Sequence, residues 1–170
     1  MTLIQFSEGR TLDLIALGRL TIDLNAEQIY QPMEETRSFT KYVGGSPANI
    51  AIGSARLGQR VGFIGKVSND QMGRFIQNYL RENQIDTSHV VVDQTGAKTG
   101  LTFTEIKSPE ESSILMYREN VADLKLDVSN ISEDYIKQAK AILLSGTALA
   151  ASPSREAVFL ALHYARKNNV

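Results

Sequence analysis

The chain has 170 residues, of which 42% are hydrophobic and 22% are charged, and its formal net charge is −1. These values are ordinary for one soluble globular domain and exclude wholesale disorder. The 18 basic residues are balanced by 19 acidic ones, so the positive excess that nucleic-acid binding requires is missing. The sequence contains no cysteine, which excludes disulfides, thiolate nucleophiles and cysteine–zinc sites.

The beginning of the sequence does not predict a signal peptide. Met1–Arg10 contains Glu8 and has no long apolar run. No stretch approaches the roughly 18 apolar residues that a membrane span needs. We therefore expect an irregular leader over residues 1–11, followed by a compact cytoplasmic domain that binds neither nucleic acid nor membranes.

The first half of the chain alternates between predicted strands and helices. Residues 12–17 are apolar except for Asp13 and are followed by Gly18, which predicts a short buried strand. The polar stretch 25–41 leads into alternating residues at 38–43, which predict an exposed or edge strand. Residues 46–57 are dense in small and apolar side chains, which predicts a closely packed helix that ends at Gly58.

The same alternation continues downstream. Residues 60–65 and 90–92 predict strands, and a helix beginning at Asp70 lies between them. The apolar side chains of this helix recur at the spacing of one helical face: Met72, Phe75, Ile76, Tyr79 and Leu80. Two β-rich runs at 101–106 and 113–118 flank a short polar turn, so we expect a hairpin.

The remaining segments complete an α/β pattern. Residues 132–139 predict a short helix and residues 141–144 a strand, and Ser152 and Pro153 predict the N-cap and first residue of a final helix. Strands that alternate with helices predict an α/β fold with a mostly parallel sheet flanked by helices. Segment 25–43 and the hairpin break this alternation, and we expect them to form a second small sheet.

The densest motif is Gly44-Gly45-Ser46-Pro47-Ala48-Asn49, between a predicted strand and a predicted helix. Two glycines permit positive φ angles and close approach of a ligand to the backbone. The helix start offers free N–H groups, and Asn49 offers a donor and an acceptor. A tight strand-to-helix turn explains the glycines equally well. The sequence has no phosphate-binding Walker A loop and no dinucleotide fingerprint.

Two charged residues near predicted strand ends are further candidates. Asp23 comes shortly after the first strand, where open α/β sheets bind ligands, and its carboxylate can accept hydrogen bonds from two hydroxyls. Arg118 ends the second hairpin strand beside Tyr117, and a guanidinium can hold a carboxylate by two parallel hydrogen bonds. A solvated turn aspartate and a surface arginine are the structural alternatives.

Several of these stretches together resemble the ribokinase (PfkB) family of sugar kinases. Gly-Gly-Ser-Pro-Ala-Asn-Ile-Ala followed by Gly58 resembles the family's first signature. Gly18–Asp23 resembles the strand end that carries its substrate aspartate. Residues 68–73 resemble its Gly-Asp-Asp-x-x-Gly stretch, with serine and asparagine at 68 and 69 in place of the commonest residues. Further stretches resemble one member that acts on a sugar acid in myo-inositol catabolism, and together they cover nearly all of 12–170: residues 19–25, 32–36, 41–49, 114–118, 145–149 and 152–156.

This resemblance implies a ribokinase-like fold over residues 12–170, with a small β-sheet lid made of segments 25–43 and 98–118. It also implies phosphorylation of a sugar acid, with ATP and Mg²⁺ as cofactors. The implied substrate-binding residues are Asp23, Gly44, Gly45, Asn49, Tyr117 and Arg118. Because the predicted hairpin is apolar on both faces, we expect the lid to mediate self-association into a homo-oligomer.

The chain departs from the family in length. Members are longer, and their catalytic aspartate lies in a Gly-Ala-Gly-Asp motif that this sequence does not contain. We therefore expect the amino-terminal half of a kinase, without the catalytic base and the nucleotide pocket, and inactive alone. Two alternatives stay open: another kinase of the family, such as a 2-keto-3-deoxygluconate kinase or a fructokinase, and a non-catalytic sugar-binding module.

Overall fold

The computed structural model describes residues 6–170 and contains two sheets. The central sheet has the strand order β5-β4-β1-β8, and its three strand pairs are all parallel. Its strands are β1 (Leu12–Leu17), β4 (Val61–Val67), β5 (Asp86–Val92) and β8 (Ala139–Leu144). This arrangement confirms the expected parallel α/β sheet.

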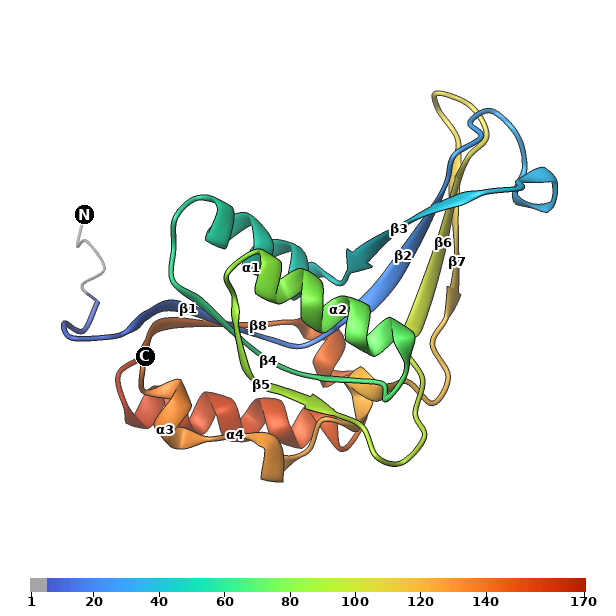
Figure 1. The fold of residues 1–170 in the computed structure, drawn as a ribbon. Coiled ribbons are helices and arrows are strands. Elements are labelled where there is room, and N and C mark those ends of the chain that lie inside the picture. Colours follow the sequence, from blue (N-terminus) through green and yellow to red (C-terminus); the bar gives the residue numbers. More distant parts are fainter. Residues whose placement is uncertain (1–5) are drawn as a thin grey trace.

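Helices cover both faces of the central sheet (Figure 1). They are α1 (Ser46–Arg56), α2 (Gln71–Glu82), α3 (Glu133–Ile136) and α4 (Ser154–Lys167). Successive side chains of a strand point to opposite faces, so Ala16 of β1 packs in the core beneath α1 and α2, whereas Ile15 packs in the core against α3 and α4. The predicted small-residue helix is α1, and its Ala48 and Ala51 are fully buried.

The second sheet stands away from one end of the central sheet (Figure 1). Its order is β3-β2-β6-β7, with β2 parallel to β6 and antiparallel to β3. The strands are β2 (Thr21–Ala26), β3 (Phe39–Gly44), β6 (Gly100–Ile106) and β7 (Ser112–Tyr117). The chain therefore forms the small additional sheet that the break in alternation predicts.

Three details differ from the sequence-based expectations. Residues 21–26 form a strand that was not predicted, so Asp23 lies inside β2 and not after a strand. Helix α4 begins at Ser154 and not at Pro153, because the Ser152 hydroxyl donates to the Glu156 carboxylate at 2.8 Å and caps no backbone N–H. Strand β5 begins at residue 86, earlier than predicted.

The connections contain short 3-10 helices at Met33–Glu35, Ala122–Lys125, Val128–Asn130 and Gly146–Leu149. Residues 6–11 form neither helix nor strand, and residues 1–5 of the expected leader lie outside the described part. Among the helices within 6–170, none is both long enough and apolar enough to cross a bilayer.

Candidate functional site

Asp23 lies in the middle of β2, opposite Tyr42 of β3 and Thr102 of β6. Residues directly opposite one another in a sheet project from the same face. Thr102 is in turn opposite Met116 of β7, so Asp23, Thr102 and Met116 share one face of the second sheet. No hydrogen bond within residues 6–170 engages the Asp23 carboxylate. This carboxylate is therefore available to a ligand.

Gly44 ends β3, and its backbone lies directly against the Asp23 carboxylate. A Cβ atom at position 44 would lie 2.1–2.5 Å from the carboxylate atoms of Asp23. Gly45 follows with φ of 106°, and a Cβ there would also lie 2.3 Å from the carbonyl oxygen of Arg19. Position 45 consequently requires glycine for backbone conformation and room, whereas a side chain at position 44 would displace the Asp23 carboxylate.

Asn49 lies in the first turn of α1, where its backbone N–H donates to the carbonyl of Gly45 at 2.9 Å. Its side chain is exposed, and no other group in the described part of the chain hydrogen-bonds to it. Asp23 and Asn49 both line two cavities, of about 370 and 270 Å³. Together these volumes fall in the range of about 300–1,000 Å³ that is typical of small-molecule sites.

The two cavities lie between the second sheet and α1 and differ in their other lining residues. The larger is completed by Asn25, Tyr42, Val43, Ile52, Gly53, Arg56 and Tyr79. The smaller is completed by Arg19, Gly45, Ser46, Thr102, Thr104, Ile114 and Met116. Hydroxyl, amide and carboxylate groups thus converge on one small volume, an arrangement that suits a ligand with several hydroxyls.

Arg118 directly follows β7 and forms an ion pair with Asp123. Its Nη2 lies 2.9 Å from Oδ2 of Asp123, whose side chain is only 2% exposed. Burial raises the pKa of Asp123, and the positive charge of Arg118 opposes that rise. Arg118 lines a third cavity of about 550 Å³, which adjoins the smaller site cavity at the shared residue Met116. Arg118 is therefore near the site formed by Asp23 but is partly neutralised there.

Tyr117 points away from the site cavity. Tyr117 is opposite Leu101, and each of these residues is one position along its strand from the pair Thr102–Met116. Because side chains alternate between faces, the Tyr117 side chain projects from the other face of the sheet. There its ring packs edge-on against Phe103 with centroids 5.9 Å apart. The structure thus brings Asp23, Gly44, Gly45 and Asn49 together, with Arg118 nearby, but does not bring the Tyr117 side chain to them.

Sequence reasoning missed Arg19 as a site residue. Arg19 lines the smaller cavity, and its Nη2 donates to Oγ1 of Thr102 at 3.0 Å. Its Nε is buried without a hydrogen-bond partner. Burial lowers the pKa of Arg19, and the charge of Arg118 acts in the same direction, while Asp123 and Asp23 act against them. The signal available in the sequence was its position next to Gly18, within the stretch that leads to Asp23.

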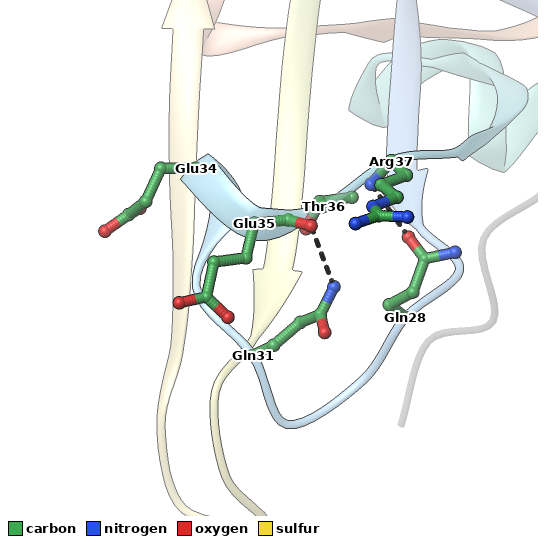
Figure 2. A pocket seen from close by; sticks show the side chains of 6 residues that line it. All are labelled: Gln28, Gln31, Glu34, Glu35, Thr36 and Arg37. Atoms are coloured by element: carbon green, nitrogen blue, oxygen red, sulfur yellow. Dashed lines mark hydrogen bonds between the residues drawn. The ribbon is translucent and has the colours of Figure 1, made fainter.

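Another cavity, of about 570 Å³, lies in the loop between β2 and β3 (Figure 2). It is lined by Gln28, Gln31, Glu34, Glu35, Thr36 and Arg37. The Gln28 amide oxygen accepts from the backbone N–H groups of residues 37 and 38, and the Gln31 amide donates to the carbonyl of Glu35. Because these amides already hold the loop together, we do not count this cavity as a site.

Residues 6–170 contain no group of three histidine, aspartate or glutamate side chains that could hold a metal ion. We assign no metal ligand among the described residues.

Comparison with known proteins assigns the chain to a family. The family model described as pfkB family carbohydrate kinase matches residues 11–170. A 5-dehydro-2-deoxygluconokinase of Bacillus anthracis is 72% identical over 165 residues, which are 97% of this chain and 50% of that protein. A protein of the same name from Geobacillus thermodenitrificans is 69% identical over 170 residues, covering 100% of this chain and 50% of that protein. The chain spans about half the length of these curated relatives.

A solved structure shows the same fold. The ATP complex of an uncharacterized sugar kinase from Pyrococcus horikoshii superposes with a TM-score of 0.81 at 32% identity, covering 89% of this chain and 49% of that chain. The expected ribokinase-like fold is thereby confirmed.

Proposed function

This chain belongs to the pfkB family of carbohydrate kinases, and on that premise we propose that the whole protein phosphorylates the sugar acid 5-dehydro-2-deoxy-D-gluconate with ATP, as a step of myo-inositol catabolism. The identity of 72% to a relative of that activity is the observation that carries the proposal. The polar cavity at Asp23 and Asn49 supports it, since its volume and donors suit a polyhydroxylated ligand.

We assign the sugar hydroxyls to Asp23 and Asn49. The carboxylate of Asp23 accepts from two hydroxyls, and the Asn49 amide both donates and accepts. Gly44 and Gly45 let the backbone lie directly against the Asp23 carboxylate and the Arg19 carbonyl, which fixes Asp23 and Arg19 beside the sugar. These contacts hold the sugar in one orientation, which is the main contribution that binding residues make to phosphoryl transfer.

The second sheet acts in this proposal as the lid, with segments 25–43 and 98–118. It supplies Thr102 and Thr104 to one wall of the cavity, while α1 forms the other. Closing the sheet against α1 would exclude water, so that the sugar hydroxyl and not water accepts the phosphoryl group. Arg118 remains our candidate for the substrate carboxylate. Tyr117 would reach the substrate only if its ring left Phe103.

ATP as the phosphoryl donor is supported by the family and by the ATP complex of the related Pyrococcus horikoshii kinase. When bound, ATP supplies the phosphoryl group, and Mg²⁺ neutralises the charge of its phosphates. We assign no residue of this chain to either group. We also propose that the protein works in the cytoplasm, where ATP is available, as a homo-oligomer joined through the lid, and without nucleic-acid or membrane partners.

The test is a phosphorylation assay on a full-length kinase made by joining this chain to the part of the Bacillus anthracis relative that it does not match. We call this protein the joined kinase. We expect kcat/KM for 5-dehydro-2-deoxy-D-gluconate to exceed that for 2-keto-3-deoxygluconate and for fructose. A preference for either competitor would assign the protein to another activity of the family. Sugar binding with no phosphorylation of any of the three would favour a sugar-binding module.

A further inference from the structure

Two arginines at the site cavity carry buried nitrogen atoms that nothing in residues 6–170 satisfies. Nε of Arg19 and Nη1 of Arg118 are both buried without a hydrogen-bond partner. A buried guanidinium nitrogen without a partner is costly, more so than a neutral donor. The two side chains also repel one another electrostatically, since the charge of Arg118 lowers the pKa of Arg19. Arg19 also donates to Thr102, which is opposite Met116, two residues before Arg118, so both arginines lie at the same part of the second sheet.

The two arginines differ in their hydrogen-bond partners within residues 6–170. Asp123 is the one acid that pairs with either of them, and its ion pair is with Arg118. Its Oδ1 is itself buried without a partner. Arg19 instead donates to the neutral hydroxyl of Thr102. Asp23 is near enough to affect the pKa of Arg19 but forms no hydrogen bond with it in the described residues. Within residues 6–170, therefore, the guanidinium of Arg118 has a carboxylate partner and that of Arg19 has none, so Arg19 can bind an anionic group of a ligand.

We infer that Arg19 is a specificity-determining residue, which together with Arg118 holds the carboxylate of a sugar acid whose hydroxyls contact Asp23 and Asn49. This inference rests on the proposed function and adds to it the residue that distinguishes acids from neutral sugars. Arg19 lies in the same cavity as Asp23 and Asn49, whereas Arg118 lies in the adjoining one. An anion in the smaller cavity would give the Arg19 guanidinium the charged partner that it lacks, through charge-assisted hydrogen bonds.

The fold holds the backbone of Arg19 in place for this contact. Gly45 packs against the Arg19 carbonyl, so closely that a Cβ at position 45 would lie 2.3 Å from it. The other arginine that lines the cavities around Asp23, Arg56, is less suited. Its Nε donates to Asn83 at 2.9 Å and its Nη2 to the hydroxyl of Tyr79 at 3.1 Å. Within residues 6–170, no side-chain nitrogen of Arg56 is both buried and without a hydrogen-bond partner.

The experiment compares two substrates in the joined kinase: 5-dehydro-2-deoxy-D-gluconate and the alcohol in which its carboxylate is reduced to CH₂OH. Arg19→Met should raise KM for the acid about 10- to 150-fold, the range expected for losing charge-assisted hydrogen bonds. KM for the alcohol and kcat for both should change much less. Arg19→Lys should recover part of the loss. Because both arginines hold one group, Arg19→Met and Arg118→Met combined should raise KM by less than the product of the single effects.

Arg37→Met removes the same charge at the loop between β2 and β3 and should leave both KM values unchanged. Equal losses for acid and alcohol in Arg19→Met, or no loss for either, would overturn the inference. Failure of the proposed function is seen separately, in the unmodified joined kinase, as a preference for other substrates. If that protein transfers no phosphate, calorimetric binding of the acid and the alcohol gives the same comparison. If another sugar acid is preferred, that acid and its reduced alcohol replace the first pair.

Discussion

The backbone of Gly44 lies so close to the Asp23 carboxylate that no side chain fits between them. Gly44→Ala would force the carboxylate to move, although alanine is chemically the smallest change. We expect KM for the sugar to rise about 10-fold or more in the joined kinase, because a misplaced carboxylate loses charged hydrogen bonds worth about 1.5–3 kcal/mol. KM for ATP should change little. Steady-state kinetics with each substrate varied in turn measures both.

Gly146→Ala is the matched control for this substitution. A Cβ at Gly146 meets nothing within 4 Å, and the residue lies in a short 3-10 helix outside the site. It should leave both KM values and the melting temperature nearly unchanged. Equal sugar KM values in the Gly44→Ala and Gly146→Ala proteins would show that the Asp23 carboxylate does not bind the sugar.

At the residue scale, Asp13 links β1 to β8 and to Arg60, the residue that precedes β4. Its carboxylate lies 2.9 Å from Nη2 of Arg60 and 2.8 Å from Nζ of Lys140, and accepts from the backbone N–H of Arg60 at 2.9 Å. Arg60 first, and then Lys140, holds the pKa of Asp13 well below its ordinary value. A carboxylate whose pKa is lower in the folded state stabilises the fold only while it is ionised.

Asp13→Asn should therefore destabilise the protein by about 1 kcal/mol at pH 7, the scale of a solvent-accessible ion pair. The contribution is complete above the unfolded pKa of about 3.9 and is lost as the pH falls through the lower folded value. The difference in the free energy of unfolding between wild type and variant should thus be constant from pH 6 to 8 and should shrink below about pH 4, as measured by urea unfolding. A gap that widens in acid would contradict this assignment. Asp134→Asn, in an exposed pair with Lys137, should show a smaller gap.

At the scale of elements, α2 depends on one capping residue. Oδ1 of Asp70 accepts from the N–H groups of Met72 and Gly73 at 2.9 and 3.0 Å and from the Ser68 hydroxyl at 2.7 Å. Asp70→Ala should cost about 1 kcal/mol of stability, as is typical when an N-cap is removed. Asp70→Asn keeps an accepting oxygen and should cost less. Thermal unfolding of the two variants checks this, and equal losses would show that the accepting oxygen at position 70 is not what stabilises the start of α2.

Elements with a strong local signal could be predicted from the sequence. The apolar stripe of α2 and its capping aspartate gave both the helix and its start. Strand β2 was missed because Thr21–Ala26 carries Asp23 and Asn25, which local preferences place in turns. It is held as a strand by pairing with β3 and with β6, far along the chain. Such pairing is a tertiary effect that a local pattern does not contain.

The site shows the same division. Asp23, the two glycines and Asn49 belong to compact motifs and lie together as expected. Thr102, the partner of Arg19, comes from a strand that is distant in the sequence, and Asp123, the partner of Arg118, lies in the 3-10 helix that follows β7. The direction of Tyr117 follows from strand register, and a shift by one residue would reverse it. The packing of different segments against one another therefore determines the hydrogen-bond partners and side-chain directions that the local motifs do not predict.

At the scale of the whole molecule, the second sheet exposes apolar side chains on both faces. Ile114 and Met116 lie on the Asp23 side, and Leu115 and Tyr117 lie on the other, each between 46% and 59% exposed. We call the face that carries Leu115 and Tyr117 the outer face, and we expect it to join two copies of the protein. Sedimentation should show a dimer at high micromolar protein concentration. Leu115→Lys should shift the protein toward monomer, because a buried unpaired charge opposes association.

Leu57→Lys controls for the added charge. Leu57 is 83% exposed at the end of α1, away from the second sheet. This variant should sediment as the wild type does. A wild-type monomer at high micromolar concentration, or equal dissociation by both variants, would exclude association through the outer face.

The pairing of β1 with β8 also sets an order in time. Leu12 is opposite Ala139, so the second neighbour of β1 is made long after β1 itself. At roughly 5–20 residues per second, a ribosome would need on the order of ten seconds to synthesise the intervening chain. Meanwhile β1 can pair with β4 alone, and its other edge stays open to wrong partners. Newly made chains would thus pass through a vulnerable period in which chaperone binding at the open edge of β1 has the greatest effect on yield.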